Sequence, residues 1–187
     1  MKKYNTVTVH SSLGDTFEAL EDDWITHEIL TFGLYGYDKK ELQAFSQVFS
    51  LMPQRNICFD VGGNIGNHTA FFCRYFKHVY ALEPNPAVYD LLAKNIASNK
   101  LAASAFNIGL SNQNGMLNFY ISNQQNIGSS SFEEDFCFNK DRVDGTVSAA
   151  VERGDDFVAT NNISNIDFIK LMWRGTKQKL LRACGAL

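Results

Sequence analysis

Residues 56–68 read NICFDVGGNIGNH, and this stretch decides how the rest of the chain is interpreted. Its apolar part, residues 57–61, predicts a short strand that is buried on both faces. A glycine-rich turn follows, and after it Asn67 is expected to cap a helix whose apolar residues recur at helical spacing. A buried strand, a glycine turn and a helix are the typical first unit of an α/β sheet.

The same pattern recurs downstream. Residues 78–86 (HVYALEPNP) predict a second buried strand that ends at Glu83, and Asn85 with the proline after it predicts a helix start. Residues 104–111 (SAFNIGLS) predict a third strand, and residues 166–171 (IDFIKL) predict the last parallel one. This order indicates an α/β fold with a Rossmann-like, doubly wound, mostly parallel sheet. Ligands of such sheets bind beyond the carboxyl ends of the strands.

The remaining elements are expected at both sides of this framework. Residues 1–50 are interpreted as an N-terminal extension of helix and strand, with a capping-box pattern at residues 38–41 that predicts a helix. Residues 51–187 form the main domain. Within it, residues 115–122 and 145–152 predict two further strands that flank a polar loop.

Composition sets the class of protein. The chain has 187 residues, 45% of them hydrophobic, and a net charge of -3, so we expect a globular core and no general attraction to nucleic acid or anionic membranes. No apolar run approaches the ~20 residues of a membrane span, and the first residues do not read as a signal peptide. The four cysteines have no metal-binding spacing, which predicts reduced thiols and a cytoplasmic location.

The glycine turn carries the chemistry. Its polar and glycine positions are Asp60, Gly62, Gly63, Asn64 and Gly66. The G-x-G-x-x-G spacing of dinucleotide sites is absent, and the Asp60 carboxylate would repel a pyrophosphate but suits a ligand with a positive charge. Glu83, about twenty residues on, can accept hydrogen bonds from a ribose diol. S-adenosylmethionine (SAM) has an ammonium, a sulfonium and a ribose, and therefore fits these demands.

Plainer readings of the same residues stay open. The glycine turn can simply pack a strand on a helix, with Glu83 as a solvated helix cap. His68 is a candidate general base, although a histidine in a first helical turn more often helps to solvate that turn. His78 is interpreted as structural. No metal site is expected, because three aspartates are interpreted as a helix start and a strand cap: Asp155, Asp156 and Asp167.

Several segments together resemble the FkbM family of SAM-dependent methyltransferases, in the family's order and over residues 30–171. They are FDVGGNIGNHTAFF, YALEPNPAVYDLLAKNIASN, FNIGLSNQNGMLNFYIS, NIGSSSF and IDFIK. The resemblance implies a fold of the class I methyltransferase type, SAM as the cofactor, and methyl transfer to oxygen. It implies a small-molecule or glycan hydroxyl as the acceptor, without selecting one. The net charge and the lack of a long apolar run, given above, predict no nucleic acid or membrane partner.

The resemblance also assigns roles to single residues. It implies that the SAM loop consists of Asp60, Gly62, Gly63, Asn64 and Gly66. Glu83 would hold the ribose hydroxyls, and Asn107 would lie near the adenine. Residues 126–132 (NIGSSSF) match a family segment near the substrate mouth. No catalytic residue is assigned.

After Lys170 the chain departs from the family. The family continues with an acidic Asp-Val-Glu-Gly turn and further strands, whereas residues 171–175 read Leu-Met-Trp-Arg-Gly. Met-Trp is encoded by ATGTGG, and a shift of one base lets the codons read Asp-Val and then Glu-Gly. We therefore hypothesise that residues 172–187 are a frameshifted tail and that the fold lacks its C-terminal strands. The alternative is a divergent but genuine C-terminus, and the coding nucleotides would decide between them.

Two other functions compete with the methyltransferase. The chain can be an inactive remnant that retains only residual SAM binding, which the missing acidic turn favours. A nicotinamide-dependent oxidoreductase is disfavoured by the absent G-x-G-x-x-G spacing and by Asp60.

Overall fold

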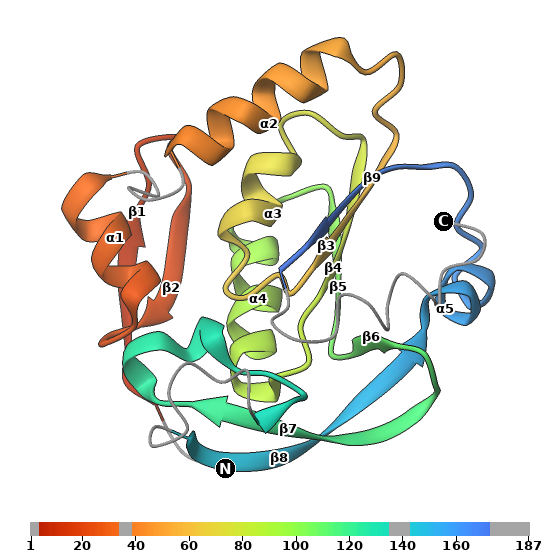
Figure 1. Ribbon diagram of the computed structural model, residues 1–187. Coiled ribbons are helices and arrows are strands. Elements are labelled where there is room, and N and C mark those ends of the chain that lie inside the picture. The colour runs from red at the N-terminus through yellow and green to blue at the C-terminus, as the bar shows by residue number, and fades with distance from the viewer. Residues whose placement is uncertain (1–3, 34–38, 135–142, 173–187) are drawn as a thin grey trace.

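The computed structural model describes residues 4–33, 39–134 and 143–172 (Figure 1). Its centre is a parallel sheet of β3 (Ile57–Val61), β4 (His78–Leu82), β5 (Ala103–Phe106) and β9 (Ile166–Leu171), in the order β5-β4-β3-β9. The chain runs from β3 outward to β5 and later returns to the other side of β3. The order therefore changes direction between β3 and β9, as expected for a doubly wound α/β sheet.

Both faces of this sheet are covered. α2 (Lys39–Leu51), α3 (Asn67–Phe72) and α4 (Pro86–Ser98) lie on one side, and α5 (Gly154–Thr160) lies on the other (Figure 1). Because side chains alternate along a strand, Cys58 of β3 packs into the cluster under α2 and α3, whereas its neighbour Phe59 packs with Phe157 of α5. Burial on both faces explains why the residues of β3 other than Asp60 are all apolar. None of the described helices is long and apolar enough to cross a bilayer.

Of the two helix caps predicted at asparagine residues, one is confirmed and the other is wrong. The Asn85 side chain caps α4 by accepting from the Ala87 N–H at 3.2 Å, as expected. The expected Asn67 cap is wrong, because Gly66 occupies the N-cap position of α3 with φ 93° and Asn67 is already helical. Of the capping-box segment, residue 38 lies outside the described residues, while the helix that the pattern predicts is present as α2.

The third expected strand is two strands in different sheets. Residues 104–111 contain the end of β5 and all of β6 (Gly109–Ser111), which leaves the central sheet and pairs with β8 (Val143–Arg153). The break falls at Asn107, whose side chain turns back to the end of β4. β8 also pairs antiparallel with β7 (Gly115–Ser122), so the two strands expected at residues 115–122 and 145–152 are confirmed.

The N-terminal segment packs into the main core. β1 (Thr6–His10) and β2 (Thr16–Leu20) form a hairpin, followed by α1 (Trp24–Phe32). Val9 and Phe17 of the hairpin are buried in the same cluster as Phe72 of α3. The division of the chain at residue 50 stays a prediction, but the two parts share one core.

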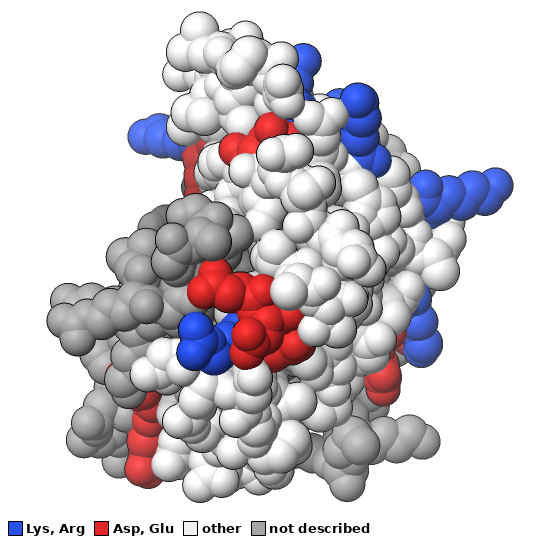
Figure 2. Space-filling model, turned by 90° about the vertical axis from the view of Figure 1, so that its right-hand side faces the viewer, with Lys and Arg blue, Asp and Glu red and all other residues white. Residues whose placement is uncertain are grey.

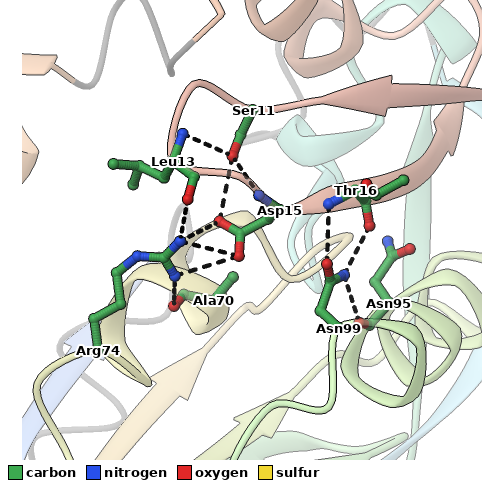
Figure 3. Close-up of polar contacts among 8 residues, drawn as sticks. All are labelled: Ser11, Leu13, Asp15, Thr16, Ala70, Arg74, Asn95 and Asn99. Carbon is green, nitrogen blue, oxygen red and sulfur yellow. Dashed lines mark hydrogen bonds and ion pairs between the residues drawn. The ribbon is translucent and has the colours of Figure 1, made fainter.

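Polar contacts fasten the hairpin to the helices behind it (Figure 3). The Arg74 guanidinium donates to both carboxylate oxygens of Asp15 and to the carbonyl of Leu13, the latter at 2.7 Å. The Asn99 side chain accepts from the Thr16 N–H and donates to the Thr16 carbonyl. These pairs join segments that lie 59 and 83 residues apart in the chain.

The cysteines in the described part are free thiols. They are Cys58, which is buried, and Cys73, which is partly buried. Burial raises the pKa of the Cys73 thiol to about 12, which makes it a poor nucleophile at neutral pH. Cys137 and Cys184 lie outside the described residues, and so does the proposed frameshifted tail from residue 173 onward.

Candidate cofactor site

The glycine turn leaves β3 in a conformation that its glycines allow. Gly62 and Gly66 have φ values of 79° and 93°, in the left-handed region that side chains with a Cβ rarely adopt. A Cβ on Gly66 would also lie only 3.0 Å from Cδ1 of Leu92 in α4. The N–H groups of Gly62 and Gly63 both donate to the carbonyl of Leu82, which fixes the turn beside the end of β4.

Asp60 lies under this turn, completely buried, and both its oxygens are occupied. Oδ1 accepts from Lys170 Nζ at 2.8 Å and Oδ2 accepts from Thr69 Oγ1 at 2.7 Å. The same ammonium donates to the Gly62 carbonyl at 3.0 Å. The positive charge that the sequence argument sought for Asp60 is thus supplied by the chain itself, and the pair holds the first residue of the glycine turn.

Lys170 was not among the residues singled out from the sequence. It lies opposite Asp60 in the register between β9 and β3, and its side chain is only 6% exposed. The available signal was one lysine inside the apolar run IDFIKL, because a fully buried lysine requires a carboxylate partner. Its partner could not be read from the sequence, since the two residues are 110 positions apart.

Glu83 directly follows β4 beside the glycine turn and is 7% exposed. Its Oε2 accepts from the Asn64 N–H at 3.0 Å, and its Oε1 accepts from the Asn85 N–H at 2.9 Å. Burial raises the pKa of this carboxyl to about 7, although the two N–H donors and Lys170 oppose the shift. The reading of Glu83 as a solvated helix cap is therefore wrong.

Two of the other expected cofactor residues, Asn64 and Asn107, contact Glu83. Asn107 Nδ2 donates to the Glu83 carbonyl at 2.7 Å, and Asn64 meets the Glu83 carboxylate through its main chain. Two buried side-chain atoms in this group have no hydrogen-bond partner in the described part of the protein, namely Oδ1 of Asn64 and Nδ2 of Asn85. The group therefore keeps an acceptor and a donor, besides the carboxylate, with which a polar ligand can pair.

The two histidines considered from the sequence, His68 and His78, have contacts with other residues. The His68 ring is 3% exposed and stacks on Phe72 at 5.9 Å between ring centroids, with Phe45 edge-on at 6.2 Å. It therefore belongs to the aromatic cluster between α2 and α3. His78 begins β4, at the opposite end of the strand from Glu83, where its Nε2 lies 3.0 Å from Ser104 Oγ.

The three aspartates for which no metal-binding role is expected make structural contacts. Asp155 and Asp156 lie in the first turn of α5 and each come within 3.8 Å of the Arg153 guanidinium. Figure 2 shows a compact group of acidic side chains beside a basic one on the side of the molecule where α5 lies. Asp167 caps the start of β3 by accepting from the N–H groups of Asn56 and Ile57. Among the described residues, no group of three or more acidic, histidine or cysteine side chains is arranged to hold a metal ion.

Comparisons with known proteins find methyltransferases. The hexuronic acid methyltransferase AglP of Haloferax volcanii is 26% identical over 127 residues, which cover 68% of this chain and 49% of the relative. This chain thus spans about half the length of that relative. A solved structure of M. jannaschii TYW2 with AdoMet is 21% identical, with a TM-score of 0.37, over 57% of this chain and 44% of that one.

A second solved structure is the T. thermophilus 16S rRNA methyltransferase RsmC with AdoMet and guanosine, 17% identical with a TM-score of 0.39 over 59% and 33% of the two chains. At these TM-scores the two structures carry no argument about function. The methyltransferase FkbM domain matches residues 60–171, which is more than half of the chain. That range begins at the buried Asp60 and ends one residue after its partner Lys170. The chain therefore belongs to the FkbM methyltransferase family.

Proposed function

We propose that this protein transfers the methyl group of SAM to an oxygen atom of a glycan or a small metabolite. The observation that carries the proposal is the place of Glu83, a buried carboxylate that directly follows β4 and accepts from the N–H of Asn64 in the glycine turn. Membership of the FkbM family supports the reaction type.

The residues present fit SAM. Glu83 would accept hydrogen bonds from the ribose hydroxyls, since among the described residues each of its oxygens accepts one N–H bond and has a lone pair to spare. The partnerless Oδ1 of Asn64 is an acceptor suited to an ammonium, and the glycines let a ligand approach the main chain closely. Asn107 would act near the adenine by fixing the end of β4 rather than through its amide nitrogen, which is already used.

When bound, SAM supplies a methyl group that is already activated by the sulfonium. The work of the chain is then to hold cofactor and acceptor in line, and such alignment contributes roughly 7–11 kcal/mol in favourable cases. Asp60 and Lys170 serve this alignment by fixing the glycine turn from below. A buried, internally paired Asp60 is positioned to shape the loop and not to touch the ligand.

The acceptor is proposed from chemistry alone. The name of the AglP relative includes hexuronic acid, a sugar that carries both hydroxyl groups and a carboxylate. A carboxylate oxygen is a nucleophile without a base, whereas a hydroxyl gains from one. We favour a hydroxyl of a glycan or small metabolite. The exclusion of nucleic acid and the cytoplasmic location stay predictions.

Cofactor binding is tested by titration calorimetry of the purified chain with SAM and, separately, with NADH. We expect SAM to bind and Glu83→Gln to raise its Kd at least about tenfold, the loss expected for a hydrogen bond to a charged group. Glu21→Gln, at an exposed position, is the matched control and should leave the Kd unchanged. The proposal would be overturned by a cooperatively folded chain that does not bind SAM, or that binds NADH more tightly than SAM.

Turnover is tested with SAM carrying a deuterated methyl group and a panel of acceptors read by mass spectrometry. A uronic-acid oligosaccharide and its carboxyl-reduced counterpart separate the two kinds of oxygen. Label on both oligosaccharides would indicate that a hydroxyl is methylated, and label on the acid alone would indicate the carboxylate. Tight SAM binding without label on any acceptor would support an inactive remnant.

A further inference from the structure

Asp23 links two segments that are far apart in the chain. Its Oδ2 accepts from the Ile25 N–H at 3.0 Å and so caps α1. Its Oδ1 accepts from the Ile127 N–H at 2.9 Å, across 104 residues. Asp23 is 4% exposed and Ile127 is 3% exposed, so this link is made inside the protein.

Ile127 belongs to η1 (Gln124–Ser129), a 3₁₀ segment that contains most of the NIGSSSF stretch. Its serines hold the segment together. Ser130 Oγ donates to the Ile127 carbonyl at 2.6 Å and accepts from the Ser122 N–H at 3.0 Å. Ser129 Oγ donates to Ser122 Oγ at 2.8 Å. η1 is therefore a compact turn fixed to the end of β7, and these two hydroxyls are engaged within it.

Gly128, the next residue of η1, lies against the glycine turn. A Cβ on Gly128 would lie 2.9 Å from Nδ2 of Asn64, closer than real Cβ contacts allow. Asn64 has φ 49° and donates its N–H to Glu83, so its position is tied to the carboxylate at the centre of the site. A continuous series of contacts thus runs from Asp23 through Ile127 and Gly128 to Asn64.

We propose that Asp23 is a positioning residue of the cofactor site: it holds η1 against Asn64, and the N-terminal segment thereby forms part of the wall of that site. The inference rests on the proposed function, since it concerns the same cofactor. It assigns the conformation of Asn64, and with it the capture of SAM, partly to a residue that the FkbM domain match does not include.

Two substitutions at Asp23 separate its two bonds. In Asp23→Ser the hydroxyl can still cap α1, because serine is a favoured N-cap, but the shorter side chain cannot also reach Ile127. Asp23→Ala removes both bonds. Asp22→Ser, at the exposed neighbouring position, is the matched control. All four proteins are compared by hydrogen exchange followed by mass spectrometry.

We expect α1 to keep its protection in Asp23→Ser and to lose it in Asp23→Ala. In both variants, residues 123–131 and the glycine turn at residues 61–68 should exchange about tenfold faster or more, while Asp22→Ser matches the wild type. If Asp23→Ser restores wild-type protection at both segments, Asp23 only caps α1 and the inference is overturned. It is also overturned if residues 123–131 loosen while the glycine turn does not.

SAM affinity provides a second readout. Calorimetry should show a Kd about tenfold higher in Asp23→Ser than in Asp22→Ser. An equal Kd would overturn the inference even if exchange changes. Hydrogen exchange requires no ligand, so a wild-type protein that fails to bind SAM would refute the proposed function while exchange still decides the role of Asp23.

Discussion

Lys170 Nζ donates to Oδ1 of Asp60 at 2.8 Å, and the two side chains are 6% and 0% exposed. A buried ion pair gains little over a well-packed apolar pair, but it is costly to break from one side because the remaining charge stays buried without compensation. The second contact of the ammonium, with the Gly62 carbonyl, joins this pair to the glycine turn. The pair therefore couples the stability of the sheet to the shape of the candidate cofactor site.

Replacing Lys170 with methionine should lower the free energy of unfolding by about 3–5 kcal/mol, because Asp60 would be left charged and unpaired. Urea unfolding followed by circular dichroism measures the loss. The control is Lys94→Met, which breaks the pair with Glu18 at 3.4 Å, where the side chains are 61% and 37% exposed. That loss should stay below about 1 kcal/mol.

The double variant Lys170→Met with Asp60→Asn tests the cause. It should be more stable than Lys170→Met alone, because no buried charge remains. A double variant that is as unstable as the sum of the two single ones would show that the charges do not interact.

The pKa of Glu83 makes stability depend on pH. Burial raises this pKa from 4.5 to about 7, so between these values the folded protein binds a proton that the unfolded chain has lost. The resulting stabilisation is fully present below pH 4.5 and is lost as the pH rises through about 7, in total roughly 3 kcal/mol. Urea unfolding from pH 5 to pH 8 should therefore show a fall in the wild type that Glu83→Gln reduces. Parallel curves for the two proteins would contradict the assignment.

SAM affinity should rise with pH, whereas the stability of the fold falls. Ribose hydroxyls donate hydrogen bonds to the ionised carboxylate, and a group with a pKa near 7 is about one-tenth ionised at pH 6. We expect a Kd about tenfold higher at pH 6 than at pH 8, measured by calorimetry in buffers of equal ionic strength. Glu83→Gln should bind weakly at both values. A wild-type Kd that is constant over this range would exclude a role for the Glu83 charge.

The sequence predicts local elements well where one pattern determines them. The strands at residues 57–61 and 166–171 are confirmed, and each is a short, mainly apolar segment. Residues 104–111 read as one strand, yet the bond from Asn107 to the end of β4 divides it, and no local pattern contains that bond. The alpha/beta class follows from the order of elements, whereas the extra sheet of β6, β7 and β8 does not.

The candidate site, too, could be predicted from the sequence only in part. Asp60, Asn64 and Glu83 are predicted as cofactor residues because they lie in or just after the ends of two strands, in a recognisable order. Lys170 pairs with Asp60 across 110 residues, and Asp23 accepts from Ile127 across 104 residues. Such pairings depend on strand register and loop packing that a single sequence does not specify. A buried polar residue in an apolar run signals a partner without naming it.

The N-terminal hairpin should depend on Arg74. Its guanidinium donates to Asp15 and to the carbonyls of Leu13 and Ala70, and lysine cannot reproduce this planar set of donors (Figure 3). Arg74→Lys should cost about 1–2 kcal/mol in urea unfolding, a value reduced by its partial exposure. Arg153→Lys, whose ion pairs are longer at 3.8 Å, is the control and should change little. Equal losses in both variants would argue against a specific role for the Arg74 fork.

Gly128 and Asn64 offer the sharpest test of the contact between η1 and the glycine turn. Gly128→Ala places a methyl group 2.9 Å from the present position of Asn64 Nδ2, so the Asn64 side chain must move and SAM affinity should fall about tenfold. Asn64→Gly removes the side chain in the way while tolerating the positive φ of 49°. In the Asn64→Gly background, Gly128→Ala should therefore have almost no further effect on the Kd. A double-mutant cycle by calorimetry measures this coupling, and strictly additive effects would mean that the two residues do not touch in solution.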